Sequence, residues 1–465
     1  MPETDISSSH IDQLRRLFQN QSKEAMRDYF TFLSFPSISS EPSYVSQVNA
    51  CADWLANYIK EIGFKVELWP TIGHPTIFAS NMDAGPDKPT LLIYNHYDVQ
   101  PVDPLQEWTS QPFEPTIRND QVFARGAQDN KGQCFYTVQA LKAMLKQNKR
   151  LPINIKLCIE GEEECGSTGL SKILKEKAEA LKADYLAIVD LGIPAINRPS
   201  ITLGVRGIIT MDVELQGSKT DMHSGFNGGL AYNPLHALVE LLACLRDSSG
   251  KITIPGFYDD VDVVSDQEKK LLSLEFDAKA YLETFGAKAT GGETAFSPLE
   301  RNWLRPSLEI NGVSGGYSGA GFKTVIPAKA FAKISCRLVP NQDPQKLGTL
   351  VAKYIESRAP DGIKVKVNVH AGGGKAVRTK ATSTIVKAFS KAYSEVFQTP
   401  CEYVFEGASI PIITELALAS QSEVVLIGLG LPGDCIHAPN EHFGLDRFEK
   451  GFMTMIRAIE LLGEI

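Results

Sequence analysis

The sequence predicts an α/β protein in which a doubly wound domain with a mainly parallel sheet is interrupted by a smaller, inserted α+β domain. Two observations predict this class. Strand-like and helix-like segments alternate over the first 200 residues and again near the C-terminus, whereas the part between them shifts toward the period-two alternation of antiparallel strands. In addition, 465 residues are too many for a single hydrophobic core. We therefore expect one domain from residues 1–204 and 377–465, and another from residues 205–376.

The first domain is predicted from apolar runs of strand length separated by segments with helical spacing. The expected strands are "TIFASN" (76–81), "TLLIYNHYD" (90–98), "INIKLCIE" (153–160) and "DYLAIVD" (184–190). The expected helices are "NKGQCFYTVQALKAMLKQ" (130–147) and "STGLSKILKEKAEAL" (167–181). Strands that alternate with helices favour βαβ units, which build parallel sheets.

The inserted domain begins where this pattern changes, at "LGVRGIITMDVELQG" (203–217). Ile209, Met211, Val213 and Leu215 share one face of an extended chain there. The elements that follow are a helix (233–247), a pair of strands (324–340), a helix (about 344–358) and a strand (363–370). This order, βα…ββαβ, is typical of a small ferredoxin-like domain. A helix from about residue 381, a strand at 423–430 and a final helix return to the α/β style.

Composition and charge argue against several kinds of partner. The chain is 43% hydrophobic and 22% charged with both signs mixed, and its formal net charge is −8, so we expect no nucleic acid and no membrane as a partner. The N-terminal "MPETDISSSH" has neither the basic nor the apolar region of a secretory leader. The eight cysteines contain no CxxC pair, which indicates free thiols in a reducing compartment. We therefore expect a cytoplasmic protein.

Residues that can bind metals or transfer protons gather where the predicted strands end. In an open α/β sheet, ligands bind at the carboxyl ends of the strands. The residues at those ends, or in the adjoining loops, are His96, Asp98, Asp129, the cluster Glu160 to Glu164, Asp190 and His437. Imidazole and carboxylate groups suit Zn²⁺, Mn²⁺ or Co²⁺. Asp98 can also accept the second ring N–H of His96, which would fix the tautomer.

Each of these residues taken alone also has a structural explanation. A strand histidine more often packs in the core than binds a metal, Asp129 could cap its helix, and His437 could be an ordinary loop residue. Their coincidence at one sheet edge is the evidence for a site. The stretch "EGEEE" (160–164) adds to it, because adjacent carboxylates after a buried strand repel and need positive charge nearby. Two metal ions about 3.5–4 Å apart would supply that charge.

The chain resembles a known family, the dinuclear-metal M20 peptidases, and within it the carnosinase-like dipeptidases. The matching blocks, in order, are "YNHYDVQP" (94–101), "ARGAQDNKG" (124–132), "EGEEECGSTGL" (160–170), "DMHSGFNGG" (221–229), "KTVIPAKAFAKISCRLVPNQDP" (323–344), "EGASIP" (406–411) and "IHAPNE" (436–441). The resemblance covers nearly the whole chain. It implies hydrolysis of the amide bond of dipeptides or closely related small substrates, by a metal-bridging water that Glu163 activates.

The resemblance also implies a role for each residue of the metal site. His96 and Asp190 would bind one metal, and Glu164 and His437 the other. Asp129 would bridge the two metals and form a cis peptide bond with the next residue. Glu163 would act as the general base, with Asp98 as a supporting catalytic residue beside the first metal. Two divalent metal ions per chain are expected, Zn²⁺ before Mn²⁺ or Co²⁺.

The inserted domain resembles the lid of this family, which also carries dimer contacts. His223 would reach into the partner's active site and stabilise the oxyanion, so a homodimer through the lid is expected. Arg337 would pair with the C-terminal carboxylate of a small peptide substrate, which matches its planar fork. Thr324 and Ser409 would add further substrate contacts. Without the resemblance, Arg337 would be interpreted as a surface charge on a strand.

Two alternatives to a dipeptidase stay open. An N-acyl-amino-acid amidohydrolase would use the same metal centre and the same carboxylate clamp. A catalytically inactive binding module should have lost a ligand or the base, whereas all six candidates are present. The chain departs from the family pattern at Asn130 and Gln128, and residues 258–306 match it least. Glu160 and Glu162 receive no role, and Glu162 is expected to tolerate substitution.

Overall fold

The computed structural model describes residues 3–272, 275–371, 373–410 and 412–465. The chain divides into two compact units, the first formed by Met1–Leu203, Thr379–Val404 and Ile412–Ile465, and the second by Gly204–Arg378 and Phe405–Pro411. The domain division expected from the sequence assigned residues 405–411 to the first domain. They join the second unit because this loop is bound there, for example by the backbone N–H of Arg206 donating to the carbonyl of Ala408 at 3.0 Å.

A nine-stranded mixed sheet organises the first unit. Along the sheet the strands are β1 (Lys65–Trp69), β2 (Thr76–Asn81), β6 (Asn154–Glu160), β3 (Thr90–His96), β7 (Tyr185–Gly192), β17 (Glu423–Gly430), β8 (Ser200–Val205) and β15 (Val377–Arg378), with β16 (Glu402–Glu406) paired to β8. The central strands β6, β3, β7 and β17 run parallel to one another, and the pairs outside them are antiparallel. The mainly parallel sheet of the predicted fold class is therefore confirmed.

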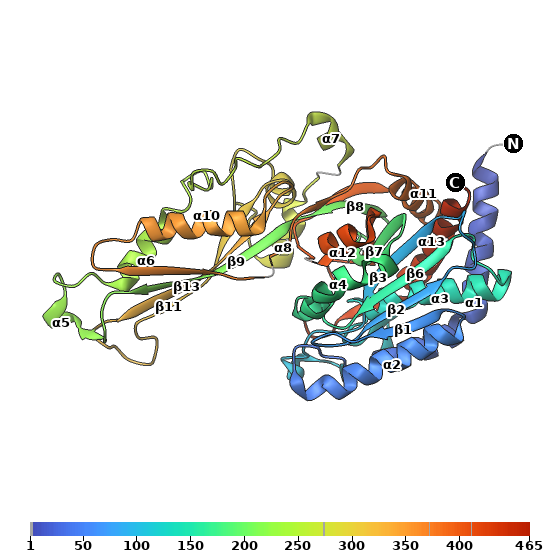
Figure 1. The fold of residues 1–465 in the computed structure, drawn as a ribbon, viewed down its shortest axis with the longest axis horizontal. Helices are drawn as coiled ribbons and strands as arrows, with labels where there is room; N and C mark the ends of the chain where they lie inside the picture. The colour runs from blue at the N-terminus through green and yellow to red at the C-terminus, as the bar shows by residue number, and fades with distance from the viewer. Residues whose placement is uncertain (1–2, 273–274, 372, 411) are drawn as a thin grey trace. The chain divides into compact units, whose positions relative to one another are not determined.

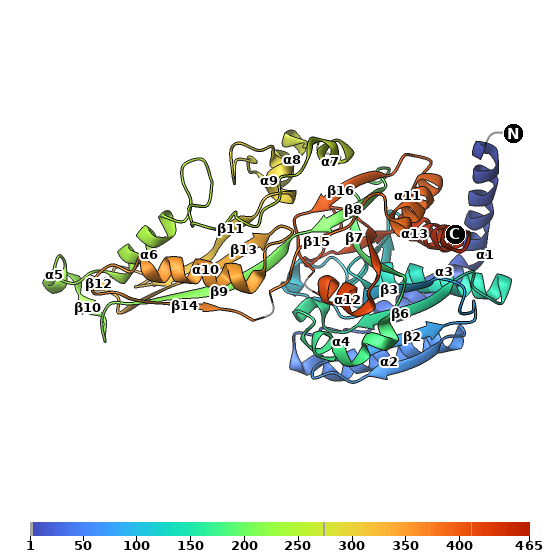
Figure 2. The same ribbon diagram turned by 45° about the horizontal axis from the view of Figure 1, so that its top comes forward.

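Helices cover both faces of this sheet (Figures 1 and 2). They are α1 (Glu3–Leu33), α2 (Val45–Glu61), α3 (Lys131–Asn148), α4 (Thr168–Leu181), α11 (Thr384–Phe397), α12 (Ile412–Ser420) and α13 (Leu445–Gly463). α4 packs against α12, whereas α1, α3, α11 and α13 form a second group. A small sheet of β4 (Thr116–Arg118), β5 (Gln121–Phe123) and β18 (His442–Gly444) completes the unit. Among the described residues, no helix has the length and apolarity that crossing a membrane requires.

The second unit has the predicted ferredoxin-like order. Its main elements are β9 (Gly207–Gln216), α6 (Pro234–Ala243), β11 (Ser307–Gly315), β13 (Lys329–Leu338), α10 (Pro344–Ser357) and β14 (Lys364–Val369). The four strands form an antiparallel sheet in the order β11-β13-β9-β14. The alternate residues Ile209, Met211, Val213 and Leu215 are buried in one core with residues of α6 and α10, as their spacing predicted.

Two strands of this unit differ from the sequence prediction. Residues 324–340 do not form a hairpin, because β12 (Val325–Ile326) pairs with β10 (Met222–His223), while β13 lies between β11 and β9. The strand β11 was not predicted, since most of its side chains are exposed and glycines interrupt its alternation. The short helices of the unit are α5 (Ser224–Asn227), α7 (Asp266–Leu271), α8 (Ala278–Phe285) and α9 (Pro298–Trp303).

Candidate metal centre

Parallel strands bring the candidate ligands of the first unit to one edge of its sheet. His96 is the last residue of β3, and Asp190 lies near the end of the neighbouring strand β7. Glu164 follows β6 in a single 3₁₀ turn, Glu163–Cys165. Asp129 directly precedes the cap of α3, and His437 belongs to the loop between β17 and β18. Segments far apart in the sequence thus meet where the topology predicts a ligand site.

Two groups of three candidate ligands share the carboxylate of Asp129. Nε2 of His96 lies 3.1 Å from Oδ1 of Asp129 and 3.6 Å from Oδ1 of Asp190. In the second group, Nε2 of His437 lies 2.9 Å from Oδ2 of Asp129 and 3.3 Å from Oε2 of Glu164. In each group the ligand atoms all lie within 4.8 Å of one another. One carboxylate between two nitrogen-and-oxygen ligand sets fits a pair of closely spaced divalent cations.

The pKa values of Glu164 and Asp190 are shifted as expected for buried carboxylates that lack nearby positive charge. Burial raises the pKa of Glu164 to about 7, and the charge of Asp129 adds to that effect. Burial also raises the pKa of Asp190. Hydrogen bonds to Asp129 and Glu164 raise the pKa of His437 to about 10. Burial thus disfavours the ionised forms of Glu164 and Asp190. Despite its burial, Asp129 has a lowered pKa, because His437 and His96 form hydrogen bonds with it. Divalent cations would supply the positive charge that favours ionisation of all three carboxyl groups.

Asp98 connects the first ligand to the segment that carries the two glutamates. It is fully buried, and its Oδ1 lies 3.3 Å from Nδ1 of His96, which leaves Nε2 of that ring directed at the ligand cluster. The same carboxylate accepts the backbone N–H groups of Glu163 at 3.2 Å and of Glu164 at 3.1 Å. Ser39 donates to it as well, at 2.7 Å. Asp98 thus fixes the ring orientation and the glutamate turn together.

The adjacent glutamates Glu163 and Glu164 have different surroundings. Oε2 of Glu164 accepts a hydrogen bond from Gln100 at 2.7 Å in addition to its contact with His437. The carboxylate of Glu163 has no hydrogen-bond partner among the described residues, and burial raises its pKa well above the usual value. A half-buried carboxylate with a raised pKa and free oxygens is suited to proton transfer.

Glu441 is a residue of this site that the sequence analysis did not identify. Its Oε1 accepts the backbone N–H groups of Gln128 and Asp129, both at 3.0 Å. Its Oε2 accepts the N–H of Gly126 at 2.9 Å and Nη1 of Arg125 at 2.8 Å. A single buried carboxylate therefore holds the backbone that carries the shared ligand. The available signal was its position at the end of "IHAPNE", four residues after a predicted ligand.

Asn130, a departure from the family pattern, has a defined place beside the cluster. Its Nδ2 donates to Oδ1 of Asp190 at 2.6 Å, and its Oδ1 accepts from Asn95 at 2.8 Å. The amide thus orients a candidate ligand without adding another negative charge. The bond between Asp129 and Asn130 is cis, which confirms the expectation from the resemblance.

The other two glutamates of the stretch 160–164, Glu160 and Glu162, have structural roles. Glu160 is fully buried and accepts a hydrogen bond from Ser167 at 2.9 Å. Glu162 is 7% exposed and accepts from Thr71 at 3.2 Å, and this burial argues against the expectation that it tolerates substitution. A Cβ added at Gly73 would lie 1.8 Å from one of its carboxylate oxygens, which shows how closely the chain encloses it.

The second unit brings its predicted functional residues together in two pairs. Nη1 of Arg337 donates to Oγ of Ser409 at 2.8 Å. Nε2 of His223 lies 3.3 Å from Oγ1 of Thr324. His223 is exposed, and its Nδ1 accepts the N–H of Gly225, so the ring also caps α5. Neither pair contains a carboxylate, which leaves both available to an anionic or polar group.

Comparison with known proteins identifies the family. The sequence model of Peptidase family M20/M25/M40 matches residues 92–461. The Cys-Gly metallodipeptidase DUG1 of Candida albicans is 31% identical, over 96% of this chain and 94% of its own. The chain belongs to peptidase family M20/M25/M40. The predicted family, its carnosinase-like dipeptidase subgroup and the metallopeptidase class of enzyme are thereby confirmed.

Solved structures of M20 peptidases share the fold over nearly the whole chain. The M20 family metallo-carboxypeptidase Sso-CP2 from Sulfolobus solfataricus has a TM-score of 0.85 and 34% identity, with 95% of this chain and 100% of that chain covered. Human carnosine dipeptidase 1 has a TM-score of 0.81 and 27% identity, with 98% and 99% covered. Membership of this metallopeptidase family implies divalent metal ions, which the ligand groups around Asp129 fit.

Proposed function

We propose that this M20 peptidase hydrolyses the amide bond of dipeptides or closely related small substrates that end in a free carboxylate. The observation that carries the proposal is the pair of three-ligand groups that share Asp129, with the unpaired carboxylate of Glu163 on the same turn as a ligand. Relatives described as Cys-Gly metallodipeptidases and carnosine dipeptidases support dipeptides as the substrate class.

Two divalent metal ions would be held by five residues. His96 and Asp190 would bind one ion, Glu164 and His437 the other, and Asp129 both. The all-nitrogen-and-oxygen ligand set suits Zn²⁺ first and Mn²⁺ or Co²⁺ as alternatives. When bound, such ions polarise the scissile carbonyl and lower the pKa of water.

The protein groups around this centre move and hold protons. Glu163 takes a proton from the attacking water and returns it to the leaving amine, since its oxygens are free and burial raises its pKa. Asp98 assists by holding the ring of His96 and the backbone N–H of Glu163 in fixed positions. Glu441 and Asn130 keep Asp129 and Asp190 oriented through the hydrogen bonds described above.

Residues of the second unit would recognise the substrate. Arg337 would bind the C-terminal carboxylate with Ser409 beside it, because a guanidinium pairs well with a planar carboxylate. His223 and Thr324 would serve the reacting carbonyl, with His223 acting in the active site of a partner subunit. This last role requires a homodimer.

Exposed apolar side chains near His223 support a homodimer through the second unit. Phe226 is 80% exposed, Leu230 82% and Phe322 91%, and they flank the paired strands β10 and β12. Large apolar side chains gathered on a surface mark an association site more often than a free one. The eight unpaired cysteines support a reducing compartment, so we propose a cytoplasmic enzyme.

The test is a substrate panel measured with Zn²⁺, Mn²⁺ and Co²⁺ in turn. It contains dipeptides, N-acetyl and N-succinyl amino acids, and one longer peptide, since a related structure is described as a metallo-carboxypeptidase. Turnover of dipeptides at rates well above the acylated amino acids is expected. Turnover of N-acyl amino acids alone would overturn the dipeptidase assignment in favour of an amidohydrolase. Metal binding without turnover of any member would favour the binding-module alternative.

A further inference from the structure

Arg206 joins two segments of the second unit that follow it in the sequence, one 96 residues and the other 201 residues further along. Its backbone N–H donates to the carbonyl of Ala408 at 3.0 Å, and its Nε donates to the carbonyl of Gly407 at 2.9 Å. On the opposite side, its Nη2 donates to Oδ1 of Asn302 at 3.2 Å. The loop 405–411 is therefore fastened to the end of α9 through one side chain.

Among the described residues, the guanidinium of Arg206 donates only to neutral acceptors, although the charges of Glu406 and Glu309 act on it from further away. Its Nη1 faces the carbonyl of Arg305 at 3.4 Å and Oγ of Ser307 at 3.3 Å, both neutral acceptors. Within the described part of the chain, neither Arg206 nor Arg337 forms an ion pair with a carboxylate. Burial lowers the pKa of Arg206 to about 10, and the positive charge of Arg337 lowers it further. These two partly desolvated cations are close enough for Arg337 to lower the pKa of Arg206, and the negative charge of Glu406 acts on both.

Gly407 allows the close approach on which this arrangement depends. A Cβ at that position would lie 2.1 Å from Oδ1 of Asn302, the acceptor of the Nη2 bond of Arg206. Two residues further along the same loop, Ser409 meets Nη1 of Arg337 at 2.8 Å. A continuous chain of contacts thus leads from Arg206 through the loop to Arg337, which we propose binds the substrate's carboxylate.

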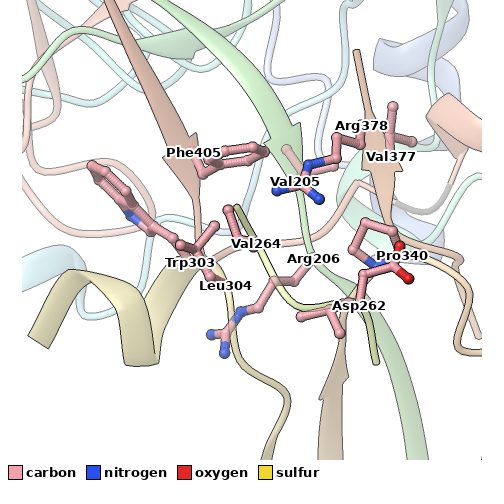
Figure 3. Close-up of a pocket in the computed structure, with 11 residues that line it drawn as sticks. Val205, Arg206, Asp262, Val264, Trp303, Leu304, Pro340, Val377, Arg378 and Phe405 are labelled. Atoms are coloured by element: carbon pink, nitrogen blue, oxygen red, sulfur yellow. The ribbon is translucent and has the colours of Figure 1, made fainter. Parts of the chain in front are cut away.

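The segment that matches the family least packs around this arginine. Figure 3 shows Arg206 beside Leu304 and Trp303, and these residues line a cavity together with Val264 and Phe405. The cavity measures about 20 Å³, which is room for about one water molecule. Residues 258–306 therefore supply one wall against the arginine, and Phe405 at the start of the loop supplies another.

We propose that Arg206 is a positioning residue for recognition of the substrate's C-terminal carboxylate. It holds the loop 405–411 so that Ser409 meets Arg337, and it adds a second positive charge near that pair. The inference rests on the proposed function and deepens it, because it explains how the chain prepares Arg337 for its role. It also gives residues 258–306 a route to substrate selection, through the contact of Asn302 with Arg206.

The test compares a hydrolysed dipeptide with its C-terminal amide, in wild type and in R206Q, R206K and G407A. For R206Q we expect KM for the dipeptide to rise about tenfold while kcat stays within about threefold, because a bond used in binding is lost. KM for the amide should change by less than about twofold. R206K keeps the positive charge but loses the planar guanidinium with its several N–H donors, so KM should rise less than in R206Q. G407A should follow R206Q in direction, since its methyl group displaces Asn302.

The matched control is R301Q. Arg301 also donates to two loop carbonyls, those of Ala289 and Gly291, and among the described residues it forms no hydrogen bond with residues 405–410. It should leave the ratio of dipeptide to amide kcat/KM unchanged. An unchanged ratio in R206Q, or an equal loss of kcat with both substrates, would overturn the positioning role while leaving the proposed function intact. A wild-type protein that hydrolyses no substrate with a free carboxylate would overturn both.

Discussion

Replacing Glu441 by glutamine should weaken metal binding as well as stability. The carboxylate accepts four hydrogen bonds, from Arg125 and from the backbone N–H groups of Gly126, Gln128 and Asp129. Glutamine has one oxygen and one NH₂ group in place of the two oxygens. The NH₂ group cannot accept hydrogen bonds, so it leaves unpaired either two backbone N–H groups or one backbone N–H group and the guanidinium. Leaving a buried donor unpaired costs about 1–3 kcal/mol, and breaking a buried ion pair costs about 3–5 kcal/mol. We therefore expect the unfolding free energy to fall by about 3–5 kcal/mol.

The metal effect follows from the position of the lost bonds. When the amide replaces Oε1, the N–H of Asp129 loses its acceptor; when it replaces Oε2, the N–H of Gly126 does, so in either orientation the backbone that carries the shared ligand is held less firmly. Loss of such an orienting contact typically weakens metal affinity about 10–100-fold. The measurements are denaturant unfolding of metal-depleted protein and a zinc titration in competition with a chromophoric chelator.

The control for this experiment is E395Q. Glu395 pairs with Arg457 at 2.6 Å between α11 and α13, so its loss should reduce stability and leave zinc affinity unchanged. An E441Q protein that is destabilised but binds zinc as tightly as wild type would refute the orienting role of Glu441. Wild-type stability together with wild-type affinity would refute the energetic reasoning as a whole.

Four further outcomes are expected. E163Q should keep both metals by elemental analysis and lose about 10²–10⁴-fold in kcat, and a near-normal rate would remove Glu163 as the base. H437A should bind one metal per chain fewer than wild type, and full metal content would exclude His437 as a ligand. In metal-depleted protein, burial raises the pKa of Glu160 from 4.5 to about 8, so the stability contributed by its protonated form is full below pH 4.5 and is lost as the pH rises to about 8. In urea unfolding, E160Q should therefore lack the fall in stability that wild type shows between these pH values. Parallel pH profiles of the two proteins would contradict this. H223A should lower kcat and recover activity in mixed dimers with an intact partner site, whereas a monomeric wild type in light scattering would contradict the trans role.

The ligand cluster could be predicted because it follows from topology. The ends of parallel strands share one edge of a sheet, so His96 and Asp190 could be placed near each other from strand assignments alone. The shared position of Asp129 and the proton-transfer role of Glu163 came instead from the resemblance. Residue type and spacing do not indicate which of two adjacent glutamates is left without a partner.

Other features could not be predicted because they depend on contacts between distant segments. Glu441 lies more than 300 residues from the backbone it holds, and no local pattern indicates that pairing. Glu162 was expected to tolerate substitution, but it is buried where glycines at 73 and 169 leave space for its carboxylate. The strand β11 exposes most of its side chains, so it lacks the hydrophobic alternation by which strands are recognised.

The positions of the candidate ligands and of Glu441 in the sequence limit when the proposed metal site can form during synthesis. The first ligand group is complete once residue 190 has been made, but the second waits for His437, and the carboxylate that fixes the shared ligand comes four residues later. The whole inserted unit, Gly204–Arg378, is synthesised in between. A nascent chain that ends before residue 437 therefore lacks the second candidate ligand group, although it already contains the first. The second of the two proposed metals can therefore be bound only after the inserted unit has been made.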